Sequence, residues 1–471
     1  MSHRPEAGDT IVVVGSGAAG LSAAVAAAEA ASQSASGIRV VLIESAPQGQ
    51  HGGNTRWSPS YMRMAAPDRV TPGFEEDMQA ASGGRADAAY FRRLREEAPN
   101  VVAWLQGHGV TFHKPVYYLS AGSDRIQPMG GGIAILTALE SAARVAGVEI
   151  RYEVRAERLL LEADGAIAAV ETRTSGGARE IVQARAVVLA SGGFVGNGEM
   201  LAQHIGPGAE SMKPISPGTR CNTGDGIRMG LAVGAKASGD WHGMHAEPVD
   251  PRSTNSAPVV LVYPYGIVVD REGRRFIDEG GGLVHETWET LSRVIHMETP
   301  GRMAYAILDA RLRDIPDYQR AIRSEVAPYQ AESIGELATL LGIAPQALQE
   351  TVARYNAAAV GDPTRFDAAR LDGLASAPGL SPPKSSWCRP LDRPPYLAYP
   401  LIGAIAYTFG GLATNTDAEV MGDSGPVRGL FAAGEITGHF YGTAPNAVAM
   451  LRALVFGRTA GRRAAEFCRQ F

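Results

Sequence analysis

The sequence predicts an α/β (α+β) fold in which a domain built on a parallel sheet is split by a capping domain. The chain opens with a strand–glycine–helix–strand pattern over residues 10–44, and further apolar runs ending in glycine follow at 186–192 and 430–434. Between the last two, from Gly239 to about Pro390, prolines and aromatic residues replace this pattern. We therefore expect a first domain segment at 1–238, a capping domain at 239–390 and the completion of the first domain at 391–471.

The first of these elements has the pattern of a Rossmann-like dinucleotide-binding unit. The apolar run Ile11–Val14 reads as a buried strand and leads into three spaced glycines, Gly15, Gly17 and Gly20. Gly15 permits the tight turn, Gly17 lets a pyrophosphate approach the backbone, and Gly20 lets the next helix pack against the strand. The phosphates would lie at the N-terminus of that helix, where free N–H groups favour an anion.

The same unit continues with a helix expected from Leu21 to about Ala31 and a second strand at Val40–Ile43. This strand ends at Glu44, a residue type and spacing suited to accept hydrogen bonds from an adenosine ribose. The pattern alone leaves FAD and NAD as alternatives.

A loop rich in glycine and small polar residues follows, with Gly52, Gly53, Asn54 and Thr55 at its centre. Such a loop suits a flat, hydrogen-bonding ligand such as an isoalloxazine ring, and an ordinary surface loop has similar composition. His51 is a candidate for covalent attachment of a flavin, but nothing local requires it, and we expect a non-covalent cofactor.

Periodicity predicts the remaining elements. Expected helices cover 72–109, 132–145, 227–233 and 447–467, with an amphipathic stretch at 333–355; expected strands cover 149–154, 159–161, 167–170, 181–182, 186–190 and 430–433. Ser191-Gly192-Gly193 forms a second strand-to-glycine turn, placed to pass under the first nucleotide site. Asp225, just before a helix, is suited either to cap that helix or to contact a cofactor.

Composition narrows the function classes. The 471 residues include 44 Lys and Arg against 49 Asp and Glu, a formal net charge of −5 without any basic tract. This balance argues against nucleic acid as the main partner. Cys221, Cys388 and Cys468 lie far apart and form no pattern typical of an iron–sulfur cluster, a zinc site or a disulfide framework. No apolar run approaches a membrane span, and residues 1–9 are polar, so we expect a soluble, cytoplasmic protein.

These motifs in this order resemble those of the fumarate reductase/succinate dehydrogenase flavoprotein family. The resemblance covers nearly the whole chain, and the motifs outside the first unit are Gly52-Gly53-Asn54, Ser191-Gly192-Gly193, Thr223-Gly224-Asp225-Gly226, Gly273-Arg274-Arg275-Phe276, Thr408 to Leu412, Gly434-Glu435 and Phe456-Gly457-Arg458. It implies that FAD, rather than NAD, occupies the first site.

Within that family the chain is most similar to the tricarballylate dehydrogenases. The points of likeness are Asn222 to Gly226, Gly239-Asp240-Trp241 with His245, Gly266 to Val269, Pro394-Pro395-Tyr396, and Pro445 and Arg452 before the last motif. Such enzymes desaturate a carbon–carbon bond beside a carboxylate, and they pass electrons to a separate iron–sulfur membrane partner. The resemblance implies the same chemistry here, with that partner or a direct reoxidant as alternatives.

Two basic positions of the family differ here. The stretch from Glu279 to Trp288, which in fumarate reductases supplies a proton-transferring arginine, contains no Arg or Lys, and Tyr441 to Asn446 stands where a histidine and often an arginine precede the last helix. The candidates for catalysis are therefore His245, which matches the family's substrate-binding histidine, Tyr441, His285 and Arg452. Tyr441 is suited to polarise a carbonyl or act as base, His285 to replace the acid/base group, and Arg452 to pair with a carboxylate.

The loss of cationic anchors favours, as the alternative, a ketone desaturase that acts on a 3-ketosteroid or a cyclic ketone through tyrosines. A flavin subunit that only relays electrons and an NAD-dependent dehydrogenase are further alternatives, and the capping domain argues against the relay. The residues expected to bind the cofactor are Gly15, Gly17, Ala18, Ala19, Gly20, Glu44, Ser45, Gly52, Gly53, Asn54, Thr55, Ser191, Gly192, Gly193, Asp225, Gly434, Glu435 and Ala449.

Overall fold

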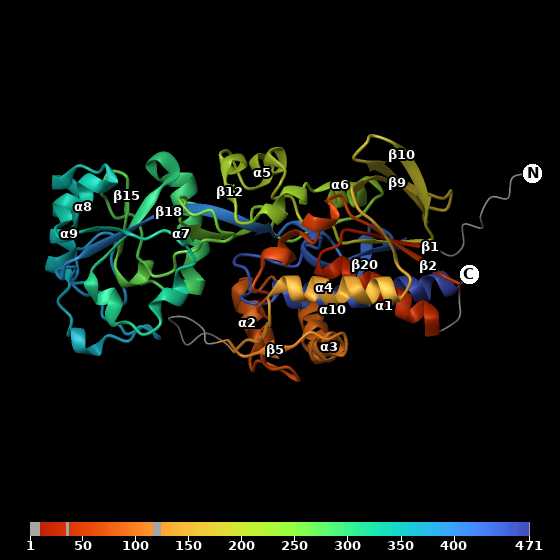
Figure 1. The fold of residues 1–471 in the computed structure, drawn as a ribbon, viewed down its shortest axis with the longest axis horizontal. Coiled ribbons are helices and arrows are strands. Elements are labelled where there is room, and N and C mark those ends of the chain that lie inside the picture. The colour runs from red at the N-terminus through yellow and green to blue at the C-terminus, as the bar shows by residue number, and fades with distance from the viewer. Residues whose placement is uncertain (1–9, 34–36, 116–123, 471) are drawn as a thin grey trace, which may run out of the picture.

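Two lobes, each built on its own sheet, lie end to end along the long axis of the molecule (Figure 1). The computed structural model describes residues 10–33, 37–115 and 124–470. The predicted α/β class is confirmed, with β1 and α10, the two ends of the described chain, in the same lobe.

The first lobe contains a six-stranded sheet in the order β20-β21-β11-β1-β2-β7. These strands are β20 (Glu419–Gly422), β21 (Gly425–Ala432), β11 (Ala186–Leu189), β1 (Thr10–Val14), β2 (Arg39–Ile43) and β7 (Glu149–Arg151). All neighbours pair in parallel except β20 and β21. The apolar run of β1 is buried because other elements cover both faces of the sheet, as parallel sheets require.

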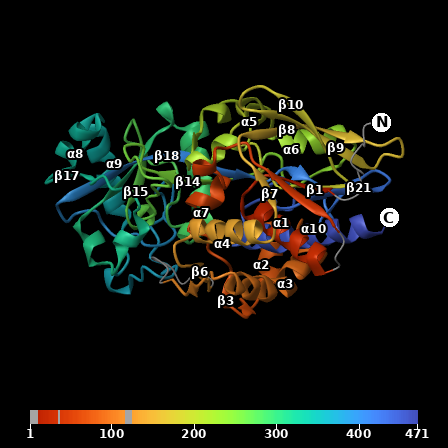
Figure 2. The ribbon, with the colours of Figure 1, turned by 45° about the vertical axis from the view of Figure 1, so that its right-hand side comes forward.

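Helices cover one face of this sheet. The helices α1 (Ala18–Gln33), α4 (Gly132–Val145) and α10 (Ala449–Arg469) lie side by side, with α2 (Phe74–Ala81) and α3 (Ala88–Gly107) outside them (Figure 1). The opposite face carries a three-stranded sheet of β8 (Val154–Leu161), β9 (Ile167–Thr174) and β10 (Arg179–Gln183), together with α6 (Asp225–Ala232) (Figure 2). Each face therefore has its own apolar core.

The second lobe is the cap, and its sheet is organised around one long strand, β18 (Tyr396–Thr408). Its other strands are β12 (Lys213–Pro214), β14 (Met244–Val249), β15 (Ile267–Asp270), β16 (Ala304–Leu308) and β17 (Tyr329–Ala331). Successive residues of β15 alternate between two cores, one shared with α7 (Val284–Glu298) and one with α8 (Ile334–Leu341) and α9 (Pro345–Ala358). This alternation is the period of two that a strand imposes on its side chains.

The remaining regular elements connect these layers. They are β3 (Met64–Ala66), β4 (Arg69–Val70), β5 (Phe112–His113), β6 (Gln127–Pro128), α5 (Gly198–His204), β13 (Ala237–Ser238) and β19 (Gly411–Leu412). Within the described ranges no helix is long and apolar enough to cross a membrane. The polar segment 1–9, on which the sequence argument against a leader rests, lies outside those ranges.

The structure shifts three expected boundaries. β18 pairs with cap strands, so the return to the first lobe comes after Thr408 rather than at 391. The stretch 333–355 forms two helices, because Gly342 ends α8 in a left-handed conformation and Pro345 begins α9. The expected helix 72–109 is likewise divided, and Asp87 caps its second part through the N–H groups of Ala89 and Tyr90.

A buried ionic cluster ties the loop at 372–390 to the cap sheet. The ammonium of Lys384 is fully buried and donates to the carbonyls of Pro264 and Gly266, at 2.7 Å each. The carboxylate of Glu279 lies 3.6 Å from that ammonium, receives two hydrogen bonds from Arg275, at 3.0 and 2.6 Å, and accepts the N–H of Val268 at 2.8 Å. Each buried charge thus has several partners, as burial of charge requires.

Candidate active site

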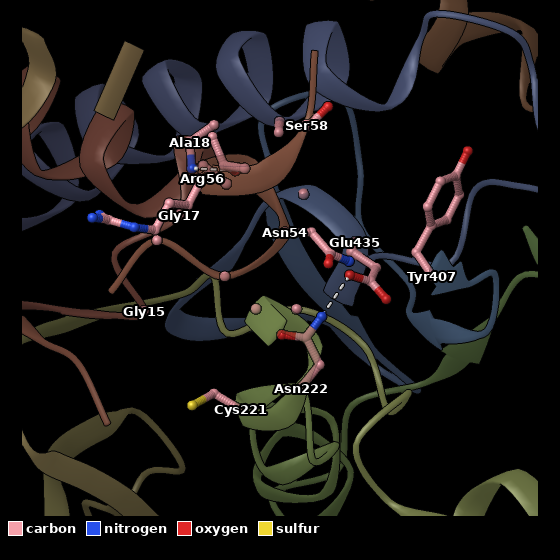
Figure 3. A pocket seen from close by; sticks show the side chains of 18 of the residues that line it. Gly15, Gly17, Ala18, Asn54, Arg56, Ser58, Cys221, Asn222, Tyr407 and Glu435 are labelled. Carbon is pink, nitrogen blue, oxygen red and sulfur yellow. Dashed lines mark hydrogen bonds between the residues drawn. The ribbon is translucent and has the colours of Figure 1, made fainter. Parts of the chain in front are cut away.

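A single cavity of about 840 Å³ runs from the carboxyl ends of β1 and β2 to the cap. Both lobes contribute to its wall, from Gly15 and Glu44 at one end to His245 and Tyr407 at the other. Figure 3 shows Gly15, Gly17 and Ala18 on one side of this space and the ring of Tyr407 on the other. The position agrees with the rule that ligands of such sheets bind beyond the carboxyl ends of the strands.

The first turn has the close packing that its glycines predict. Gly15 has a φ of +102°, and a Cβ on it would lie 2.5 Å from the carbonyl oxygen of Ala190. A Cβ on Gly20 would lie 1.8 Å from the carbonyl oxygen of Gly15, so α1 can reach β1 only with glycine at this position. Gly20 therefore lies behind the cavity wall, where it sets the distance between helix and strand.

Glu44 lies at the cavity wall at the end of β2, where the sequence places it. Its carboxylate accepts the N–H and the hydroxyl of Ser16, at 2.9 and 2.6 Å, and the N–H of Ala46 at 2.8 Å. These bonds hold the acid against the glycine turn. His51 contacts the hydroxyl of Ser16 at 3.1 Å and the carboxylate of Glu140 at 3.2 Å, and it is not among the residues that line the cavity.

The loop at 52–55 connects the two ends of the cavity. The hydroxyl of Thr55 accepts the N–H of Ala18 at the start of α1, at 3.1 Å. The amide of Asn54 donates to the carbonyl of Ala406 in β18 at 2.6 Å and accepts the hydroxyl of Ser216 at 2.8 Å. The loop thereby fixes the cap strand β18 relative to the nucleotide turn.

A buried carboxylate closes the floor of the cavity. Glu435 accepts the N–H of Thr408 at 3.1 Å and the side-chain amide of Asn222 at 3.0 Å (Figure 3). Burial raises the pKa of Glu435 to about 7, although the N–H of Thr408 and the charge of Arg452 oppose that rise. Gly193 lies directly behind this carboxylate, because a Cβ there would approach its Oε1 to 2.3 Å.

The free energy of unfolding should therefore depend on pH through Glu435. Its pKa is about 7 in the folded protein against 4.5 ordinarily, so folding favours the protonated acid and the wild type loses stability as pH rises from about 4.5 to above 7. The expected loss is about 3 kcal/mol. In urea unfolding of FAD-free protein, Glu435→Gln should lack this loss, whereas the exposed Glu162→Gln should retain it. Identical pH dependence in Glu435→Gln and wild type would contradict the assignment.

Most residues predicted to bind the cofactor line the cavity. They are Gly15, Gly17, Ala18, Ala19, Glu44, Ser45, Gly52, Gly53, Asn54, Thr55, Ser191, Gly192, Asp225, Gly434, Glu435 and Ala449. Asp225 does not cap its helix: its carboxylate accepts the hydroxyl of Thr223 and pairs with Arg155 and Arg228. Three further residues of the wall, Ser16, Arg56 and Asn222, are not among the predicted cofactor-binding residues. Asn222 stands in a quoted motif, so a signal for it existed.

The cap end of the cavity centres on His245 in β14. Its Nε2 lies 3.1 Å from Oε1 of Glu247, and its Nδ1 is in hydrogen-bond contact with Glu289 of α7. The ring of Tyr407, opposite it in β18, stacks on the imidazole with 4.8 Å between centroids. The strand pairing shifts register between His245 and Ala246, and such bulges redirect side chains at active sites.

Two arginines that the sequence argument missed line the same end. Arg125 lies just before β6 and is 3% exposed, and Arg323 comes from the cap, 198 positions further along the chain. Tyr61 lies between them: its hydroxyl is 3.4 Å from Arg323 and its ring centroid is 5.7 Å from the guanidinium carbon of Arg125. Arg125 also donates to the amide oxygen of Asn446 at 3.3 Å.

The other predicted catalytic residues have different positions. Arg452 lines the cavity, buried over the ring of Phe440 at 3.7 Å, and donates to the carbonyl of Thr437. The hydroxyl of Tyr441 accepts the N–H of Gly239 at 3.2 Å and contacts Ser238, behind the wall. The candidate role of Tyr441 at the substrate is therefore not supported by its position.

His285 also lies behind the wall. Burial, together with the charges of Arg125 and Arg63, lowers its pKa to about 4, so its ring is neutral at pH 7. It meets the edge of Trp288 at 6.4 Å between centroids. His285 is thus a neighbour of Arg125 and Arg63 that does not itself line the cavity, and the acid/base role predicted for it stays a prediction.

Fold and site together define a flavoprotein-type oxidoreductase: a dinucleotide cradle opens into a capped, charged chamber. A family model described as "FAD binding domain" matches residues 10–449, and the chain belongs to that family. FAD is its cofactor, and the glycine turn, Glu44 and the loop at 52–55 are the parts that fit it. The protein is an FAD-dependent oxidoreductase that acts on CH–CH groups.

Several known proteins are similar to nearly the whole chain. A probable fumarate reductase of Shewanella frigidimarina (strain NCIMB 400) is 30% identical over 476 residues, which cover 97% of this chain and 74% of the relative. The vinyl phenol reductase of Lactiplantibacillus plantarum is 27% identical over 510 residues, covering 98% and 97%. The open conformation of a flavocytochrome c3 fumarate reductase superposes with a TM-score of 0.78 at 27% identity, covering 99% of this chain and 79% of that one. The predicted likeness to fumarate reductase flavoproteins is confirmed.

Proposed function

We propose that the protein interconverts a carbon–carbon single and double bond beside the carboxylate of a small substrate, which Arg125 and Arg323 bind. One observation supports this proposal above all: Arg125 and Arg323, which are far apart in the chain, both line the cap end of the cofactor cavity. Guanidinium groups bind carboxylates through paired hydrogen bonds, and a partly buried site strengthens such pairs.

The charges of the chamber favour an anion. Arg125, Arg323 and Arg452 border it, and Glu247 is the carboxylate of its wall at this end. Arg125 and Arg323 can supply the positive charge that the stretches 279–288 and 441–446 lack, and Arg452 matches the family pattern. Tricarballylate, the substrate indicated by the sequence resemblance, carries three carboxylates and is one candidate.

Aromatic side chains form the rest of this chamber. Trp57, Tyr61, Trp288 and Tyr407 line it, so a substrate with an apolar or ring-bearing substituent also fits its chemistry. Some relatives bear names that span this range, from fumarate reductase to vinyl phenol reductase. The alternative of a ketone desaturase relied on Tyr441, whose hydroxyl is bound to the backbone of Gly239.

The mechanism divides the work between cofactor and chain. FAD, when bound, supplies the two-electron chemistry by accepting or giving a hydride at the carbon β to the carboxylate. Arg125 and Arg323 orient the carboxylate and stabilise the negative charge that develops on it as the α-proton leaves. Trp288 and Tyr407 exclude water from the reacting carbons, which strengthens these electrostatic contacts.

The first experiment is to follow flavin absorbance under anaerobic conditions against paired panels. Oxidised holoenzyme meets tricarballylate, succinate, 3-phenylpropionate, cyclohexanone and a 3-ketosteroid; dithionite-reduced holoenzyme meets aconitate, fumarate, cinnamate and cyclohexenone. We expect a carboxylate to bleach or restore the flavin band. Reaction with the ketones alone would overturn the proposal.

Arg323→Gln should weaken carboxylate binding selectively. Loss of a charge-assisted hydrogen bond costs about 1.5–3 kcal/mol, so the Kd for citrate or benzoate, measured by perturbation of the flavin spectrum, should rise about 10- to 100-fold. The Kd for cyclohexanone should stay unchanged. Arg320→Gln, an exposed arginine three residues away, is the matched control. Equal citrate affinity in Arg323→Gln and the control would exclude Arg323 as the anchor.

A further inference from the structure

A line of three ionisable side chains leads from the cavity wall into the contact between β14 and α7. Glu247 faces the cavity, His245 stands next to it, and Glu289 lies on the far side of the imidazole. Oε2 of Glu289 accepts the N–H of Ala444 at 3.1 Å, which fixes this carboxylate in place. The order along the line is carboxylate, imidazole, carboxylate.

This arrangement determines the protonation state of His245. Both ring nitrogens face carboxylate oxygens, and only the doubly protonated imidazolium can donate to both. Burial alone lowers the pKa of His245, but Glu289 and Glu247 together raise it to about 10. Burial likewise opposes ionisation of Glu247, yet His245 and Arg323 lower its pKa below the ordinary value. At pH 7 His245 is therefore an imidazolium, with one proton on each ring nitrogen, and it lies between two carboxylates.

The same contacts prevent His245 from binding substrate directly. Its two N–H groups are directed along the line, the ring of Tyr407 stacks on one face of the imidazole, and Trp288 lies at 74° to the imidazole plane. His245 and Glu247 both line the cavity, and the side chain of Glu247 is the more exposed of the two, 19% against 11%. Arg323 remains protonated throughout the ordinary pH range, so it serves as an anchor rather than a base.

We propose that Glu247 is the catalytic base and acid of the reaction, and that His245 and Glu289 position it. The inference rests on the proposed function, because it assumes a proton removed beside an activating group. The contacts that support it do not involve the two arginines proposed to bind the substrate. The carboxylate of Glu247 in the cavity wall is hydrogen-bonded to the imidazole of His245, which is hydrogen-bonded to the carboxylate of Glu289.

The step balances as follows in the direction of oxidation. The Cα–H bond breaks, its proton passes to an oxygen of Glu247, and its electron pair becomes the new π bond as a hydride leaves Cβ for FAD. Glu247 later releases the proton to solvent that enters the cavity, because His245 already carries a proton on each ring nitrogen and stays an imidazolium beside the carboxylate. The reduction of a double bond uses the same transfers in reverse.

Glu247→Gln is the direct test, with Glu298→Gln, an exposed residue at the end of α7, as the control. The assay is flavin bleaching or restoration by whichever panel compound reacts with the wild type. Because positioned general acid–base catalysis contributes about 10²- to 10⁴-fold, the rate should fall by that factor. The Kd for citrate should change less than about threefold relative to the control. A wild-type rate in Glu247→Gln would overturn the proposal.

Two measurements other than the rate at one pH test whether His245 and Glu289 control the protonation of Glu247 or serve only the structure. In ¹⁵N NMR of histidine-labelled holoenzyme, the signal of His245 is the one that disappears in His245→Gln. Its pKa should be near 10 in the wild type and should fall toward 6.5 in Glu289→Gln. A pKa near 6.5 in the wild type would overturn the proposal. His245→Gln removes a cation beside Glu247, so the acidic limb of the pH–rate profile should move to higher pH. His242→Gln, an exposed histidine nearby, should leave it in place.

Failure of this inference is distinguishable from failure of the proposed function. If only a ketone reacts, the carboxylate proposal falls, yet the rate of Glu247→Gln with that ketone still decides the proton transfer. If a carboxylate reacts at the wild-type rate in Glu247→Gln, the proposed function stands and the base is another group.

Discussion

Gly20→Ala is expected to abolish FAD binding. The added methyl would lie 1.8 Å from the carbonyl oxygen of Gly15, and because that oxygen belongs to the backbone, α1 must move away from β1. Overpacking of a core costs about 3 kcal/mol or more when no flexible side chain can yield. The displacement also moves the N-terminus of α1, whose N–H groups would bind the pyrophosphate.

The measurement is the ratio of FAD to protein after purification, from visible and ultraviolet absorbance. Gly107→Ala at the end of α3 is the control, since a Cβ there would meet nothing within 4 Å. It should keep full FAD occupancy and be as stable as the wild type or slightly more so. Full FAD occupancy in Gly20→Ala would contradict this prediction, because it would mean that α1 can move away from β1 without loss of the FAD-binding site.

Glu279→Leu should destabilise the cap by about 3–5 kcal/mol, because it leaves two buried cations without their shared anion. The ammonium of Lys384 and the guanidinium of Arg275 are both held by this carboxylate, and the N–H of Val268 loses its acceptor as well. Burial already lowers the pKa of Lys384. We expect the thermal midpoint to fall by several degrees and the cap to unfold at lower urea.

The comparison variant is Glu272→Gln, an exposed acid in the turn after β15 that pairs with Arg274. Its effect should stay within about 0.5 kcal/mol, as for most surface substitutions. A loss below about 1 kcal/mol in Glu279→Leu would show that the two cations find other partners or lose their protons at little cost.

The nucleotide half of the site was predictable because its signal is local. Gly15, Gly20 and Glu44 each act within one βαβ unit, so their spacing alone determines their place. The substrate half was not. Arg125 and Arg323 stand in loops without periodicity, and only the pairing of β14 with β18 and the position of the cap bring them together.

Tyrosines illustrate the same limit. Tyr441 precedes the last helix, as a site residue of this family would, but its hydroxyl bonds to Gly239. Tyr407, in the middle of an apolar strand sequence, reads as core and instead faces His245. A strand places neighbouring residues on opposite faces, so the identity of the face requires the register, which the sequence does not contain.

The central sheet also imposes an order on biosynthesis. The neighbour of β1 in the sheet, β11, begins 176 positions after β1 begins, and β21 and α10, which pair with β11 and cover α1, follow the whole cap in the chain. Because domains fold as units during synthesis, the nascent first lobe must wait for the whole cap to emerge. The FAD cradle can therefore be completed only once β21 and α10 have been made, and a stop codon early in α10 would yield a protein with the whole cap but without the helix that covers α1.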